Sequence, residues 1–220
     1  MAAADAPAAF SVDFVGDVVC PWCFLGWMRL KAALAQRSDL AFEVAWRPFQ
    51  LQFDIPDEGL PYAVFMEDRF PDRARRREMD ERLTGLGADE GVEFHLEAIA
   101  RRPNTNAAHR VIRWCGARGG EMAETIMRAY FSEGRDIGDP ALLAELAPAH
   151  GLDAETVRRR LASGEDRETV DEACRMAARA GIQGVPFTIM DNRVALSGAE
   201  TPDRILLAID KALEPGGPAA

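Results

Sequence analysis

The sequence predicts an α/β protein in which the two ends of the chain build one small sheet and a long helical segment lies between them. Three observations lead to this prediction. Alternating apolar residues near the start indicate two strands joined by a helix. Helical apolar periodicity dominates from about residue 60 to residue 180. A second pair of short strands and a last helix follow. Neither end has enough strands for a stable sheet of its own, so we expect the ends to share one.

The first fifty residues predict a strand, a helix and a second strand. Phe10, Val12 and Phe14 alternate with polar residues, and residues 42–46 repeat this pattern. Between them, residues 24–36 place apolar side chains on one helical face. Two strands joined by a helix pack in parallel with a crossover connection. Residues 48–60 contain Pro48, Pro56 and Gly59 and predict a loop.

The middle of the chain carries the start signals of helices. Asp139 precedes Pro140, which predicts an N-cap followed by proline at the first helical position, and Asp153 can cap the next helix. After this block, residues 187–190 and 194–196 predict a hairpin, and a last helix begins near Thr201. We therefore predict one domain formed by residues 8–55 and 182–214. An all-helical domain over residues 56–181 is inserted into it.

Composition limits the function classes. The chain has 220 residues, 48% of them hydrophobic, which suffices for a core. Its net charge of −10 argues against nucleic-acid binding. No apolar run approaches the roughly 18 residues of a membrane span, so we expect no membrane partner. The N-terminal residues lack the basic and apolar regions of a secretory signal, which leads us to expect a cytoplasmic protein with mostly reduced cysteines.

The most informative motif is Cys20-Pro21-Trp22-Cys23, between the first strand and the first helix. A helix N-terminus presents unpaired N–H groups and partial positive charge, which favour a thiolate. Cys20 is therefore the predicted nucleophile. Cys23, one turn later on the same face, is the predicted resolving thiol of a thiol–disulfide exchange. Pro21 suits the first turn of a helix because it has no N–H to leave unpaired.

Two other interpretations of the motif stay open at this point. The cysteines could be half of a zinc site, but zinc needs two more ligands, and the remaining cysteines and histidines are scattered along the chain. They could also be two buried core cysteines. A strand before the motif and a helix after it favour redox chemistry. We predict no metal.

Several stretches together resemble the DsbA family of thiol–disulfide oxidoreductases, and more narrowly its FrnE-like branch. The main ones are Asp17 to Cys23 (DVVCPWC) and Gly184 to Phe187 (GVPF). Supporting stretches are Asn104-Thr105, Ala108 to Arg110, Ala129 to Phe131, Glu133 to Ile137 and Ala195 to Ala199. The resemblance implies a thioredoxin-like fold with an inserted all-helical domain. It also implies polypeptide thiol or disulfide substrates, with the Cys20–Cys23 disulfide as the only redox group. Glutathione or a thioredoxin-type protein is the candidate recycling partner.

The resemblance also assigns substrate-binding residues. It implies that Pro186 is cis and lies against the cysteines, which would let the Val185 backbone pair with an extended substrate. Pro21 and Trp22 would contact the same substrate. His109 would lie near the site, where it could tune the thiolate, hold substrate or be purely structural. Independently of the resemblance, Phe24, Trp27 and Phe187 could form an apolar rim with Trp22, or they could be core residues, as most such aromatic residues are.

The sequence departs from the family pattern at two positions. Strongly oxidising DsbA proteins have a histidine between the cysteines, and this chain has Trp22, which carries no positive charge. We therefore expect a more reducing couple. Thioredoxin-type proteins place a buried acid six residues before the first cysteine, where this chain has Phe14. Asp17 is nearer the site and could assist proton transfer from Cys23, or it could be a solvated loop residue.

Two rival functions remain. Glutathione-dependent isomerases and transferases of the hydroxychromene-carboxylate isomerase and kappa-class types resemble this fold, although they carry serine at the position of Cys20. A non-enzymatic chaperone that uses the helical segment is the second rival. Cys115 and Cys174 lie on apolar helical faces, and we interpret them as small buried thiols rather than a regulatory pair.

Overall fold

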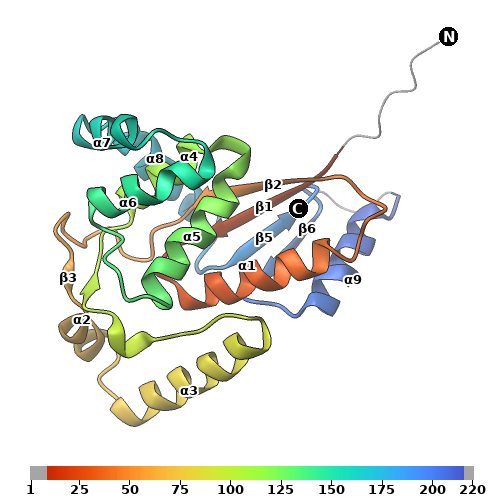
Figure 1. The fold of residues 1–220 in the computed structure, drawn as a ribbon. Helices are drawn as coiled ribbons and strands as arrows, with labels where there is room; N and C mark the ends of the chain where they lie inside the picture. The colour runs from red at the N-terminus through yellow and green to blue at the C-terminus, as the bar shows by residue number, and fades with distance from the viewer. Residues whose placement is uncertain (1–8, 216–220) are drawn as a thin grey trace.

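A four-stranded sheet forms the centre of the protein, seen in a computed structural model that describes residues 9–215. Its strand order is β2-β1-β5-β6 (Figure 1). The strands are β1 (Phe10–Gly16), β2 (Phe42–Pro48), β5 (Phe187–Met190) and β6 (Val194–Ser197). β1 runs parallel to β2 and antiparallel to β5, and β5 and β6 form a hairpin. The two ends of the chain therefore share one sheet, as predicted.

Helices surround this sheet. α1 (Pro21–Leu34) connects β1 to β2, and α9 (Pro202–Leu213) follows β6 and packs on α1. The other α-helices are α2 (Tyr62–Arg69), α3 (Arg73–Asp89), α4 (Asn106–Trp114), α5 (Gly119–Phe131), α6 (Pro140–Leu146), α7 (Ala154–Ala162) and α8 (Arg167–Arg179). Asp139 and Asp153 accept hydrogen bonds from backbone N–H groups of α6 and α7, which confirms both predicted caps. Within residues 9–215 no helix combines the length and apolar character that crossing a membrane requires.

Two short strands within the helical segment were not predicted. β3 (Leu60–Pro61) and β4 (Arg101–Arg102) pair antiparallel, with Leu60 opposite Arg102. Strands of two residues are too short to produce an alternating pattern, so the sequence contains no signal for them. The pairing ties the start of α2 to the end of the long connection from α3. It also brings Arg102 to the site described below.

One continuous apolar cluster includes side chains from the sheet and from the helical segment. α5 and α8 both contact β2, so helices of this segment pack directly on the sheet. At the centre, the Phe14 ring lies 5.4 Å from Trp27 and 5.2 Å from Trp46, between ring centroids. These contacts fix the end of β1 against α1. The domain boundaries after residue 55 and before residue 182 stay a prediction.

Candidate active site at the Cys20–Cys23 dithiol

Cys20 occupies the N-cap position of α1, with φ −97° and ψ 111°, and Pro21 follows at the start of the helix. The backbone N–H groups of Cys23 and Phe24 both point back to the Cys20 carbonyl, at 2.9 and 3.3 Å. The thiol therefore sits where the partial positive charge of the helix N-terminus is strongest. The first turn of α1 contains no acidic residue to oppose it.

Cys23 lies one turn further along α1 and is completely buried. Burial raises the pKa of the Cys23 thiol well above its ordinary value, and the neighbouring Cys20 thiol and the Asp17 charge raise it further. Both cysteines are free thiols in this structure. The two thiols are thus different: Cys20 lies at the helix start, and Cys23 is a buried, protonated thiol beneath it.

The Val185–Pro186 peptide bond is cis, as the resemblance implied. The Cys20 thiol donates to the Val185 carbonyl, with Sγ and O 3.6 Å apart. Pro186 is buried, and the Gly198 N–H donates to its carbonyl at 2.8 Å, which continues the pairing of β5 with β6. Residues 165 positions apart in the sequence therefore meet at Cys20.

Gly26 on α1 allows Pro186 to approach. A Cβ atom at position 26 would lie 2.9 Å from Pro186 Cγ and 3.4 Å from the Ala199 Cα. Neither neighbour is a flexible side chain. We expect Gly26→Ala to push Pro186 away from Cys20, to destabilise the protein by about 1 to 3 kcal/mol, and to slow disulfide exchange. Urea unfolding and exchange rates measure both effects. Gly85→Ala on α3, where a Cβ meets nothing within 4 Å, is the control; equal behaviour of the two variants would contradict this packing.

Asp17 is buried, not solvated, which corrects the second of its two predicted roles. Its Oδ2 accepts from the Leu51 N–H at 2.9 Å, and its Oδ1 lies 3.4 Å from His109 Nε2. Burial alone would raise the pKa of Asp17, but the hydrogen bond and charge of His109, the charge of Arg102 and the Leu51 N–H outweigh it and lower this pKa. Asp17 is therefore a buried carboxylate.

His109 projects from α4 and is as buried as Asp17. Its Nε2 lies 3.1 Å from the Phe49 carbonyl as well as near Asp17. His109 does not line the cavity that contains Cys20. The structure therefore brings His109 to the carboxylate behind the dithiol, and its role in binding substrate stays a prediction.

A cavity of about 290 Å³ opens directly beside the motif. Cys20, Pro21, Trp22 and Val185, all predicted site residues, line it together. Its far wall comes from α2 and α3, which the sequence did not connect with the site: Tyr62, Phe65, Met66, Met79 and Leu83. Trp22 is partly exposed and lines this cavity, whereas Phe24 and Trp27 lie in the core and form no rim.

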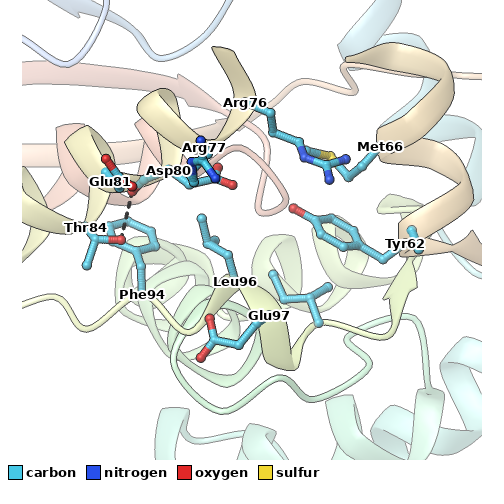
Figure 2. A pocket seen from close by; sticks show the side chains of 12 residues that line it. Tyr62, Met66, Arg76, Arg77, Asp80, Glu81, Thr84, Phe94, Leu96 and Glu97 are labelled. Atoms are coloured by element: carbon cyan, nitrogen blue, oxygen red, sulfur yellow. Dashed lines mark hydrogen bonds between the residues drawn. The ribbon is translucent and has the colours of Figure 1, made fainter. Parts of the chain in front are cut away.

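A second cavity of about 630 Å³ adjoins the first beneath α2 and α3. Tyr62, Met66, Asp80 and Leu96 line both. Figure 2 shows the second cavity, with Tyr62 and Met66 of α2 facing residues of α3 across the opening. Apolar surface thus continues from Cys20 under these two helices.

The other two cysteines differ from the dithiol. Burial raises the pKa of Cys174 to about 12 and that of Cys115 to about 11. Both are therefore protonated at neutral pH, which agrees with the interpretation of small packed thiols, although Cys115 is only half-buried. Among the described residues, no group of three or more His, Cys, Asp or Glu side chains is arranged to hold a metal ion.

The fold and the site define a class: a thioredoxin-like sheet with inserted helices, a CxxC dithiol at a helix start and a cis-proline against it. Residues 11–210 match the DSBA-like thioredoxin domain family, and the chain belongs to this family. It is therefore a member of the DsbA-like thiol–disulfide oxidoreductases.

Individual relatives agree with this assignment. The crystal structure of a probable DsbA oxidoreductase from Streptomyces coelicolor superposes with a TM-score of 0.85 at 28% identity, covering 96% of this chain and 93% of that one. The uncharacterized protein YwbO of Bacillus subtilis is 26% identical over 87% of this chain and 92% of its own length. A hydroxychromene-carboxylate isomerase shares the fold, with a TM-score of 0.65 at 18% identity over 90% of this chain and 91% of that one.

Proposed function

We propose that the chain is a cytoplasmic thiol–disulfide oxidoreductase of the FrnE-like branch that works in the reductase or isomerase direction. One observation carries the proposal: Cys20 occupies the N-cap position of α1 while its thiol contacts the Val185 carbonyl of a cis Val185–Pro186 peptide. A nucleophile, a resolving thiol one turn away and a backbone segment for substrate thus meet at one point.

The reaction follows from the difference between the thiols. The Cys20 thiolate attacks one sulfur of a substrate disulfide, a Cys20–substrate disulfide forms, and the other substrate sulfur leaves as a thiolate and takes a proton. Cys23 then loses its proton and attacks Cys20, which releases the second substrate thiol. The substrate gains two electrons and the dithiol becomes a disulfide. Because Cys23 is buried and protonated, it does not compete with Cys20 for the first attack.

The proposed substrates are polypeptide disulfides and thiols. The edge of the site at Gly184 and Val185 can pair with an extended backbone, and partly exposed Trp22 offers an apolar contact beside it. Glutathione or a thioredoxin-type protein would return the disulfide to the dithiol. The net charge of −10 supports a partner other than nucleic acid.

The reduction potential of the Cys20/Cys23 couple tests the proposed direction. We expect a value between about −180 and −270 mV, the range from protein disulfide isomerase to thioredoxin. The reason is that Trp22 supplies no positive charge to the Cys20 thiolate, so the reduced form gains less than in a strong oxidant. Equilibration with glutathione buffers followed by mass spectrometry measures it. A value near about −120 mV, typical of DsbA, would contradict a reductase or isomerase.

The Cys23→Ala protein separates this function from its rivals. A thiol–disulfide oxidoreductase loses turnover when the resolving thiol is removed. If Cys23→Ala retains glutathione conjugation or glutathione-dependent isomerisation of a small molecule, the result would favour the glutathione-dependent enzymes. Holdase activity that survives loss of both Cys20 and Cys23, without any disulfide exchange in the intact protein, would favour the chaperone.

A further inference from the structure

Arg102 is a buried cation on the wall of the cavity that contains Cys20. Its side chain comes from β4, and the residue is only 5% exposed. Nη1 donates to the Val19 carbonyl at 3.0 Å, Nη2 donates to the Gln52 side-chain oxygen, and the guanidinium lies 4.8 Å from the centre of the Phe65 ring. Its Nε has no hydrogen-bond partner among the described residues.

No carboxylate of residues 9–215 forms an ion pair with Arg102. Asp17 is close enough to feel its charge, but Asp17 directs its oxygens to His109 and to the Leu51 N–H. The other deeply buried arginines are satisfied differently. Arg29 forms an ion pair with Glu90 at 2.7 Å, and Arg110 donates from Nε and Nη2 to backbone carbonyls. A buried cation with no carboxylate in direct contact is costly, so an anion that enters this cavity gains a strong partner.

The rest of the lining is mostly apolar and aromatic. Tyr62, Phe65, Tyr130 and Phe131 surround the space. Asp80 is the acidic residue among its lining side chains, and the exposed Arg69 is a second cation there. Burial raises the pKa of Asp80 above its ordinary value. A volume of about 290 Å³ lies at the lower end of small-molecule sites. The cavity therefore suits one ring or a group of similar size together with one anionic group.

We propose that this cavity binds small organic disulfides that carry a carboxylate next to an apolar or aromatic group, with Arg102 holding the carboxylate. The proposal rests on the proposed function, because it uses Cys20 as the attacking thiol, and it adds a small-molecule substrate class to the polypeptides. Cys20 is itself only 4% exposed and faces the cavity, so a compact disulfide reaches it through this space.

The reaction is the same two-electron exchange. The Cys20 sulfur bonds to the sulfur of the half that Arg102 holds, and the other half leaves as a thiolate. Cys23 then loses its proton and attacks the Cys20 sulfur, the bound half departs as a second thiolate, and the Cys20–Cys23 disulfide remains. No further oxidant or reductant is needed in this half-reaction.

Two aromatic disulfides of similar size test the role of the charge. The reduced wild-type protein reacts with dithiobis(nitrobenzoate), which is anionic, and with dithiodipyridine, which is neutral, and both reactions are followed by absorbance. We expect Arg102→Gln to slow the first reaction by at least about tenfold and to leave the second within about twofold. Arg101→Gln, on the same strand but outside the cavity, removes an equal charge and is the control. It should change neither rate by more than about twofold.

Equal rates of Arg102→Gln and wild type with the anionic disulfide would overturn the proposal, as would an equal loss in Arg101→Gln.

Because Arg102→Gln could fail to fold, the wild-type protein gives a second test. Benzoate should slow alkylation of Cys20 by neutral iodoacetamide more than benzamide does, and equal protection would overturn the proposal. If neither disulfide reacts with wild type, the proposed function fails. In that case calorimetry still tests the anion site, because the site should bind benzoate more tightly than benzamide.

Discussion

Cys20→Ser should reduce the rate of insulin disulfide reduction by at least about a thousandfold, to the rate seen without protein. The hydroxyl that replaces the thiol does not form a mixed disulfide, and the buried Cys23 cannot take over because burial holds it protonated. Turbidity from precipitating insulin chains, with a thiol reductant supplied, measures the rate. Cys115→Ser, a half-buried thiol on another element, should keep full activity.

Cys23→Ser should behave differently from Cys20→Ser. Cys20 still attacks the substrate, but no neighbouring thiol releases the product, so a mixed disulfide accumulates. Mass spectrometry of the non-reduced protein should find a covalent adduct at Cys20 in Cys23→Ser and none in Cys20→Ser. Full turnover by Cys20→Ser, or adducts on Cys23, would contradict the assigned roles.

Asp17→Asn should lower the pKa of Cys23 and speed closure of the Cys20–Cys23 disulfide at neutral pH. The Asp17 charge is one of the causes that raise the pKa of Cys23, after burial and the Cys20 thiol. A carboxyl with a lowered pKa is also a weak base toward a thiol with a raised one. We therefore expect Asp17 to act on Cys23 mainly through its charge. The pH dependence of alkylation in a Cys20→Ser background measures the shift.

The opposite result would assign another role to Asp17. If Asp17 carries the Cys23 proton, Asp17→Asn slows disulfide closure by about tenfold or more. Asp13→Asn, which removes a charge from β1 beside Arg47, is the control and should leave closure unchanged.

Asp17→Asn should also change how the stability of the protein depends on pH. The pKa of Asp17 is lower in the folded than in the unfolded state, so its ionised form stabilises the fold above the unfolded pKa. That contribution is lost as the pH falls through the folded pKa, a loss that Asp17→Asn should not show.

The sheet could be predicted because its strands alternate clearly and its hairpin is marked by a turn. Asp191 and Asn192 both adopt positive φ angles, near 50°, which these residue types tolerate. The helix caps at Asp139 and Asp153 could also be predicted, because a capping side chain binds backbone N–H groups a few residues away. Each of these features depends on residues that are close in sequence.

The surroundings of the dithiol were only partly predictable. The motif itself indicated Cys20 and Cys23, and the resemblance pointed to Val185 and Pro186. Arg102 carried no signal, because the two-residue pairing of β4 with β3 brings it to the cavity. The sequence pointed to Asp17 as a residue near the site, but its contact with His109 joins residues that are far apart in the sequence. Whether such a carboxylate is buried depends on tertiary packing, which a local pattern does not contain.

The central claim is that the start of α1 makes Cys20 reactive while Cys23 beneath it stays inert. Alkylation of the reduced protein by iodoacetamide at neutral pH, followed site by site with mass spectrometry, tests this claim most directly. We expect Cys20 to react at least about tenfold faster than Cys23 and faster than a free small-molecule thiol. Two thiols that react slowly and at the same rate would contradict the account.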